Sequence, residues 1–87
     1  MWQVYLIQNN ITKEIYVGYT NNLQRRLLEH NDFGKKQRFT YSKQGKWIII
    51  YFECFRNKND AIMRERKLKL HGRGIQELKK RLENSFL

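Results

Sequence analysis

The first 18 residues contain two short strand-like segments, and this pair constrains the fold more than any other feature. Residues 2–8 and 14–18 are rich in apolar and aromatic side chains. The polar stretch between them contains Asn9 and Asn10, which suits the turn of a β-hairpin. The chain is therefore expected to begin with an antiparallel strand pair.

The register of this hairpin determines which side chains meet. A tight turn centred on Asn10 and Ile11 places Tyr5 directly opposite Tyr16. Directly opposed residues point to the same face, with Cβ atoms about 4.5 to 5.5 Å apart. One face would carry both phenols and Gly18. The other face would be apolar, with Val4, Leu6, Ile15 and Val17.

Residues 21–30 show the spacing of a helix, with Leu23 and Leu27 one turn apart as its buried stripe. Thr20 is the expected N-cap. At about 100° per residue, Arg26 lies within about 60° of Leu23, and so does His30, one helical turn further on. Arg25 points about 160° away from Leu23, so Arg26 and not Arg25 is expected to border the sheet.

The middle of the chain changes from polar to strongly apolar. Residues 31–46 form a basic polar loop, longer than most connections. Residues 47–55 read as a third strand, too continuously apolar to have an exposed face. The single cysteine, Cys54, excludes an intramolecular disulfide and is expected to be buried in this strand.

Two further helices are expected in the C-terminal third. Asn57 and Asp60 resemble a capping box for a helix over 58–70, and Glu65 falls inside its apolar stripe. A carboxylate in that position needs a cation. After the break at 71–72, a last helix over 74–84 places Ile75, Leu78 and Leu82 on one face.

The organisation and charge of the chain limit what it can be. Residues 1–87 contain no proline, repeat or low-complexity linker, so a single domain is expected. No apolar run approaches the roughly 20 residues of a membrane span, and the first residues do not resemble a signal peptide, so a cytoplasmic location is expected. The formal net charge of +10 favours a polyanionic partner, nucleic acid before membrane.

The combined motifs resemble the GIY-YIG nuclease family, in particular its small single-domain bacterial members. The resemblance rests on the order and spacing of five stretches. They are Val4-Tyr5-Leu6, Tyr16-Val17-Gly18, Leu23-Gln24-Arg25-Arg26-Leu27, Glu29-His30-Asn31, and the segment 60–69 around Glu65. The resemblance spans nearly the whole chain. It implies an α+β fold in the order β-β-α-β-α-α, with a three-stranded antiparallel sheet flanked by helices.

The resemblance also implies a Mg²⁺-dependent endonuclease, with Mn²⁺ as a substitute ion, and assigns a role to five residues. Tyr5 would be the general base, and Tyr16 would order water or phosphate. His30 would be hydrogen-bonded nearby, Arg26 would contact the scissile phosphate, and Glu65 would ligate the metal. Whether Tyr5, Tyr16 or His30 is the base stays open.

These residue types suit phosphodiester hydrolysis on chemical grounds as well. The reaction needs a deprotonated water and stabilisation of the charge that develops at phosphorus. A single carboxylate such as Glu65 suffices for Mg²⁺, which keeps several waters and takes other ligands from substrate phosphate. The planar guanidinium of Arg26 suits a phosphate. A phenol ordinarily titrates near pH 10, but a neighbouring cation favours phenolate.

Further contacts to nucleic acid, DNA before RNA, are expected from the basic loop and the hairpin. Gly18 would allow close backbone approach, and Lys35, Lys36 and Arg38 would contact phosphates without reading sequence. Tyr41 would either stack on an unpaired base or close the core.

Other interpretations remain open. Facing tyrosines often serve only cross-strand packing, and His30 could complement a helix dipole. Glu65 could form a structural ion pair with Arg64, Lys69 or Arg26. A protein that kept the fold and binds nucleic acid without cleaving it is the main alternative function. The charge alone would also suit a small ribosome-associated protein. No protein partner is implied.

Overall fold

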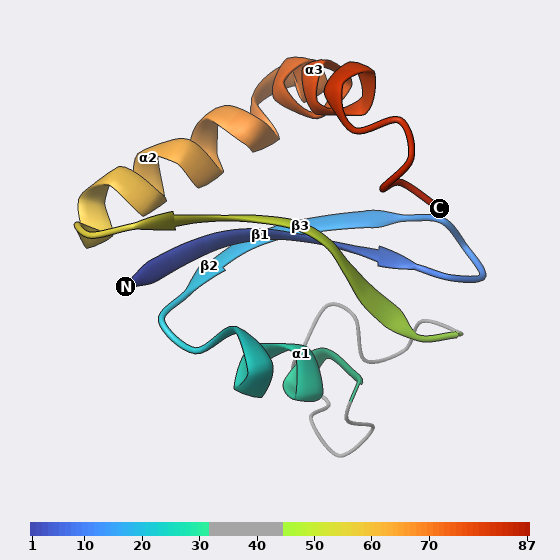
Figure 1. Ribbon diagram of the computed structural model, residues 1–87, viewed down its shortest axis with the longest axis horizontal. Coiled ribbons are helices and arrows are strands. Elements are labelled where there is room, and N and C mark those ends of the chain that lie inside the picture. The colour runs from blue at the N-terminus through green and yellow to red at the C-terminus, as the bar shows by residue number, and fades with distance from the viewer. Residues whose placement is uncertain (32–44) are drawn as a thin grey trace.

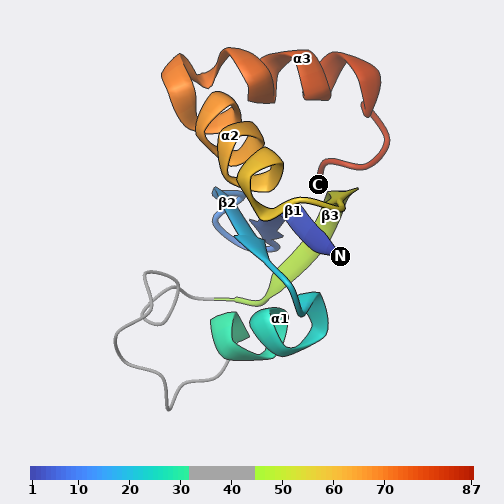
Figure 2. The same ribbon diagram turned by 90° about the vertical axis from the view of Figure 1, so that its left-hand side faces the viewer.

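The computed structural model describes residues 1–31 and 45–87, which form one three-stranded antiparallel sheet with helices on both faces (Figure 1). The strands lie in the order β2-β1-β3. Helix α1 covers one face, while α2 and α3 cover the other (Figure 2). The elements are β1 (Trp2–Asn9), β2 (Ile15–Thr20), α1 (Leu23–Asn31), β3 (Trp47–Phe55), α2 (Lys58–Lys69), the 3₁₀ turn η1 (Leu70–Gly72) and α3 (Arg73–Arg81). The predicted fold class and element order are confirmed.

The hairpin register differs from the prediction by two residues. Tyr5 pairs with Gly18, and Tyr16 pairs with Ile7. Because strand side chains alternate with a period of two, a shift of two residues preserves the faces. Tyr5 and Tyr16 therefore still share one face, as diagonal neighbours and not as direct partners.

The register differs because the turn is longer than predicted. The Asn9 side-chain oxygen accepts hydrogen bonds from the backbone N–H groups of Ile11 and Thr12, which holds residues 10–13 in a wider loop. Lys13 completes this loop with a positive φ of 66°. The asparagine that suggested a tight turn thus stabilises a wider one.

The sheet separates two groups of buried side chains. Val4, Leu6 and Val17 pack toward α2 and α3, with Ile15 partly buried beside them, as predicted. Tyr5, Ile7 and Trp47 form the buried group on the other face, against Leu23 and Leu27 of α1. The face that carries the phenols is therefore also largely apolar.

Helix α1 begins two residues later than predicted. The expected cap, Thr20, is the buried last residue of β2. The side-chain oxygen of Asn22 instead accepts a hydrogen bond from the backbone N–H of Arg25, so Asn22 caps the helix. Thr20 supports this turn by accepting a hydrogen bond from the backbone N–H of Asn22.

The prediction that β3 has no exposed face is wrong. Phe52 is 50% exposed, Ile48 is also exposed, and Cys54 is an exposed free thiol and not a buried one. β3 lies at the edge of the sheet, and α1 packs against only part of it. Apolar sequence alone does not reveal which strand lies at an edge.

The C-terminal helices follow the predicted pattern with small changes. Asn57 caps α2 by accepting a hydrogen bond from the backbone N–H of Asn59, at 2.8 Å. Gly72, with a φ of 69°, ends the 3₁₀ turn and allows α3 to begin in a new direction. Leu78 of α3 is buried as predicted. No helix in the described ranges is both long and apolar enough to span a bilayer.

Candidate active site

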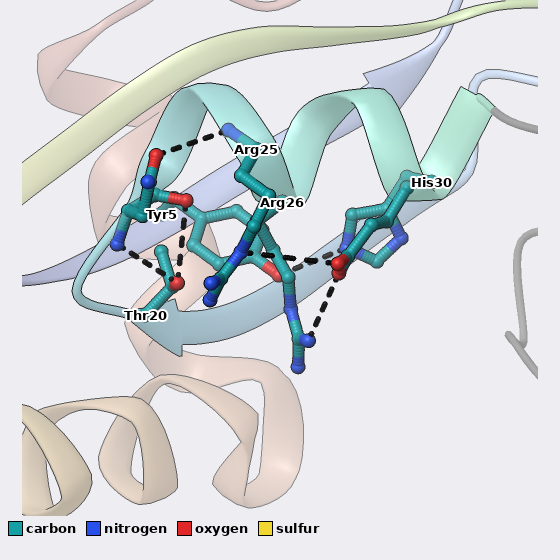
Figure 3. A network of polar contacts seen from close by, with 7 residues as sticks. Tyr5, Thr20, Arg25, Arg26 and His30 are labelled. Atoms are coloured by element: carbon teal, nitrogen blue, oxygen red, sulfur yellow. Dashed lines mark hydrogen bonds and ion pairs between the residues drawn. The ribbon is translucent and has the colours of Figure 1, made fainter.

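The buried centre of the candidate site is a contact between β1 and α1. The Tyr5 hydroxyl oxygen lies 2.9 Å from Nε2 of His30, and Figure 3 shows Tyr5 reaching from the strand toward the helix. Tyr5 is 0% exposed and His30 is 3% exposed. His30 is buried because it follows Leu23 and Leu27 along the sheet-facing side of α1. A phenol and an imidazole thus share a short contact in a site closed to bulk water.

Tyr16 from β2 completes this cluster. Its ring packs edge-on against His30, with ring centroids 4.7 Å apart, and lies 6.3 Å from the Tyr5 ring. Tyr16 is partly exposed, unlike the other two residues. We refer to Tyr5, Tyr16 and His30 as the tyrosine–histidine cluster, in which Tyr16 is the member nearest solvent.

The two adjacent arginines of α1 differ in direction as predicted. The Arg26 side chain is 28% exposed, whereas the Arg25 side chain is 59% exposed. Both contact Glu29, but Arg26 makes the shorter ion pair, with Nη1 at 3.3 Å from Oε1. Figure 3 shows these side chains together with Tyr5 and His30.

The electrostatics of Arg26 link it to the cluster. Partial burial acts against its charge, but hydrogen bonding and charge attraction from Tyr5 and Glu29 outweigh burial and raise the pKa of Arg26 above its ordinary value. The Nε atom is buried and has no hydrogen-bond partner within the described residues. Arg26 is therefore a permanent cation beside Tyr5 that keeps unused hydrogen-bonding capacity.

Gly18 is placed directly against Tyr5. A Cβ atom at position 18 would lie 2.5 Å from the Tyr5 hydroxyl oxygen and 2.7 Å from Cζ of the same ring. Only a glycine leaves room for the phenol across the strand pair. This close approach explains the glycine without any ligand, so contact with nucleic acid at Gly18 stays a prediction.

Glu65 joins the site around the outer edge of β2. It lies on α2, which covers the opposite face of the sheet from α1, and its side chain is 14% exposed. Its Oε2 lies 2.9 Å from Nζ of Lys69, and the same Nζ lies 5.9 Å from the centre of the Tyr16 ring. Because β2 is an edge strand, Tyr16 can contact Lys69 from the other face. Lys69 therefore connects Glu65 to the tyrosine–histidine cluster.

The donor set at Glu65 is compatible with Mg²⁺. Across residues 1–31 and 45–87, no three His, Cys, Asp or Glu residues gather as a metal-binding group. A dedicated all-protein cage is therefore absent from this part of the chain. A single, mostly buried carboxylate at the rim of a basic site is sufficient for a metal that takes its other ligands from water and phosphate.

The structure thus brings together four of the five residues with predicted catalytic roles, since Tyr5, Tyr16, Arg26 and His30 lie on one face of the sheet. Glu65 lies on α2 at the other face, and Lys69 links it to Tyr16 at the β2 edge. The predicted nucleic-acid contacts Lys35, Lys36, Arg38 and Tyr41 lie outside the described residues.

The sequence assigned no catalytic role to two residues of the site, although it left a structural ion pair between Glu65 and Lys69 open. Glu29 orients Arg26, and Lys69 holds Glu65. Both follow their partner by one helical turn, three residues for Glu29 and four for Lys69, which is the spacing at which oppositely charged helical side chains meet. That spacing was the available signal, although it is common on helix surfaces.

Comparison with known proteins agrees with the fold. The GIY-YIG family model, described as the GIY-YIG catalytic domain, matches residues 1–83. The chain therefore belongs to the GIY-YIG nuclease family. Among its relatives are UPF0213 proteins, for example one from Bacillus pumilus that is 38% identical over 74% of this chain. The solution structure of a UPF0213 protein from Bacillus halodurans has a TM-score of 0.55 and 26% identity, covering 94% of this chain and 85% of that one.

The relatives differ from this chain in length. An uncharacterized protein of Acanthamoeba polyphaga mimivirus is 41% identical over 70% of this chain, but the match covers only 38% of that protein. For the Bacillus pumilus protein the match covers 63% of its length. The matched region thus spans less than two thirds of these curated relatives.

Proposed function

We propose that this protein is a Mg²⁺-dependent endonuclease that hydrolyses phosphodiester bonds in nucleic acid. The observation that carries the proposal is the short contact between Tyr5 and His30, beside the partly buried cation Arg26. Structural packing needs a tyrosine ring here, but it does not need an arginine beside it whose buried Nε has no hydrogen-bond partner among the described residues. The membership of the chain in a nuclease family supports the same activity.

In the proposed mechanism Tyr5 is the base. With Nε2 of His30 unprotonated, the Tyr5 hydroxyl donates to His30, and the positive charge of Arg26 favours loss of the phenol proton. The phenolate then takes a proton from water, and the resulting hydroxide attacks phosphorus as the bond to the leaving oxygen breaks. Because Tyr5 is buried, this mechanism requires the site to open toward the substrate on the side of the partly exposed Tyr16.

The remaining residues bind and orient the phosphate. Arg26, held by Glu29, presents its guanidinium to the scissile group, and Tyr16 orders water or phosphate at the solvent side. Glu65 would hold the metal, which when bound stabilises negative charge on the leaving oxygen. Mn²⁺ is expected to substitute.

The proposed partner is nucleic acid, DNA before RNA. The net charge of +10 supplies affinity for a phosphate backbone without selecting a sequence. Selection among single-stranded, damaged and branched substrates would then arise from the shape of the site and not from base contacts.

The direct test compares cleavage with binding. Purified protein is incubated with Mg²⁺ and end-labelled single-stranded, duplex and branched DNA, and with RNA of the same sequence. We expect cleavage of at least one substrate by the native protein, none by Glu65→Gln, and similar binding by both in anisotropy titrations, because the carboxylate serves the transition state. Binding without cleavage by the native protein would instead support an inactive nucleic-acid-binding protein.

A further inference from the structure

The ion pair at Glu65 occupies the position that the proposed metal would take. Lys69 Nζ lies 2.9 Å from Oε2 of Glu65, so an ammonium already neutralises the carboxylate in the metal-free protein. The pair is asymmetric, since the Glu65 side chain is 14% exposed and the Lys69 side chain is 50% exposed. The glutamate is thus held by the fold, whereas the lysine has room to move.

The surroundings of Lys69 define where it can move. Lys69 and Tyr16 both line a hollow of ≈ 340 Å³ at the β2 edge, whose other walls are mostly aliphatic. Its Nζ already lies 5.9 Å from the centre of the Tyr16 ring, and the face of a tyrosine ring attracts a cation. A small rotation of the lysine side chain would therefore release Glu65 while its ammonium stays beside Tyr16.

We propose that Lys69 is a positioning residue that acts as the resident counter-ion of Glu65 and is displaced when a divalent cation binds. This inference rests on the proposed function, because it takes Glu65 as the metal ligand. It assigns two consequences to Lys69. The lysine keeps the carboxylate at the sheet edge when metal is absent, and it weakens metal binding, because the ion pair must break first.

Metal titration of the protein without nucleic acid tests the second consequence. Isothermal calorimetry with Mg²⁺ and Mn²⁺ is performed on native protein and on Lys69→Met, Lys69→Arg and Lys67→Met. Breaking an ion pair of this kind is expected to cost ~2- to 5-fold in affinity, so Lys69→Met should bind metal more tightly by that factor. Lys69→Arg keeps the positive charge and should bind like the native protein.

Lys67→Met is the matched control, because it removes the same charge from the same helix. Lys67 lines a separate hollow between α2 and α3, with Arg64 and Arg73. Two residues along the helix place Lys67 about 160° around the axis from Glu65, on the other side of α2. Its affinity should change less than that of Lys69→Met. Equal affinities for the two methionine variants, or weaker binding by Lys69→Met, would overturn the proposal, since a purely structural role predicts no gain.

A second measurement separates this inference from the proposed function. Urea unfolding in EDTA of Glu65→Gln, Lys69→Met and the double variant should reveal coupling, with the double variant less destabilised than the sum of the single changes. Additive effects would overturn the counter-ion role even if Glu65 binds metal. A third outcome is coupling in unfolding together with metal binding that is unchanged in Glu65→Gln. That outcome would establish the ion pair but reject Glu65 as the metal ligand, and with it the displacement of Lys69.

Discussion

At the scale of single residues, the two adjacent arginines of α1 have the same chemistry but point in different directions. Arg26 lies beside Tyr5 and is partly buried, whereas Arg25 is mostly exposed. Arg26→Ala is therefore expected to lower the single-turnover cleavage rate by roughly 10²-fold or more, because it removes charge stabilisation from the transition state. Arg25→Ala should keep a rate within a few-fold of the native protein. Equal losses would show that the helix orientation does not select the functional arginine.

At the same scale, the close approach of Gly18 to Tyr5 predicts an effect of substitution on stability. A methyl group at this position meets the Tyr5 hydroxyl at 2.5 Å, so either the ring or the strand must shift. Gly18→Ala is expected to lower the free energy of unfolding by about 1 to 3 kcal/mol, measured by urea denaturation. In a Tyr5→Leu background the same change should cost less, because the phenol is gone. An unchanged cost in that background would locate the strain elsewhere.

At the scale of elements, sequence pattern predicted the order of strands and helices well but not the boundaries or the edges. The spacing of Leu23, Leu27 and His30 correctly identified the buried side of α1. The hairpin register was missed because Asn9 supports a wider turn as readily as a tight one. The exposure of Phe52 was missed because an edge position is a property of the assembled sheet.

The candidate site was predictable to the same degree. The spacing of the family motifs was sufficient to predict roles for Tyr5, Arg26 and Glu65. Each of these residues lies on a strand or helix whose buried side can be read from the pattern of apolar residues. It did not reveal that Glu65 approaches from the other face of the sheet, or that Lys69 connects it to Tyr16. Such contacts depend on how α2 crosses the edge strand, which periodicity along a single helix does not encode.

The link between β3 and α2 gives a prediction about acid stability. Arg64 Nε and Nη2 donate hydrogen bonds to the Glu53 carboxylate, which also accepts one from the Tyr51 hydroxyl at 2.8 Å. Burial raises the pKa of Glu53, but the hydrogen bonds from Arg64 and Tyr51 outweigh it, so the folded-state pKa lies below its ordinary value of 4.5. The resulting stabilisation is present above pH 4.5 and is lost as the pH falls through the lowered pKa.

Urea denaturation between pH 7 and pH 3 tests this sign. The native protein is expected to lose stability steadily below pH 4.5, and Glu53→Gln, which cannot ionise, should show a shallower loss over the same range. Glu83→Gln is the control, because it removes an acid from an exposed position after α3. A pH dependence as steep in Glu53→Gln as in the native protein would contradict the account.

At the scale of the whole molecule, the distribution of charge predicts how binding responds to salt. The net charge of +10 makes affinity for nucleic acid fall as salt rises. Lys35 and Lys36 follow the helix that carries Arg26, whereas Lys79 and Lys80 belong to α3 on the opposite face of the sheet. Replacing either pair of lysines with a neutral residue removes the same amount of charge.

Anisotropy titrations over a range of salt concentrations distinguish the two pairs. Replacing Lys35 and Lys36 with glutamine should reduce the slope of log affinity against log salt by roughly 1.4 for single strands and roughly 1.8 for duplex. The same change at Lys79 and Lys80 should leave the slope nearly unaltered. Equal reductions would mean that the polyanion also contacts α3.

The central claim, that the tyrosine–histidine cluster activates water for phosphodiester cleavage, is tested most directly by the pH dependence of single-turnover cleavage. With saturating Mg²⁺, the native rate should rise with pH until the base is ionised. Tyr5→Phe, which keeps the ring, should be slower by roughly 10² to 10⁴ and should lose that rise, while Tyr16→Phe should be slower but keep it. A native-like rate and pH profile in Tyr5→Phe would contradict the account, and loss of the rise only in His30→Ala would move the base to the histidine.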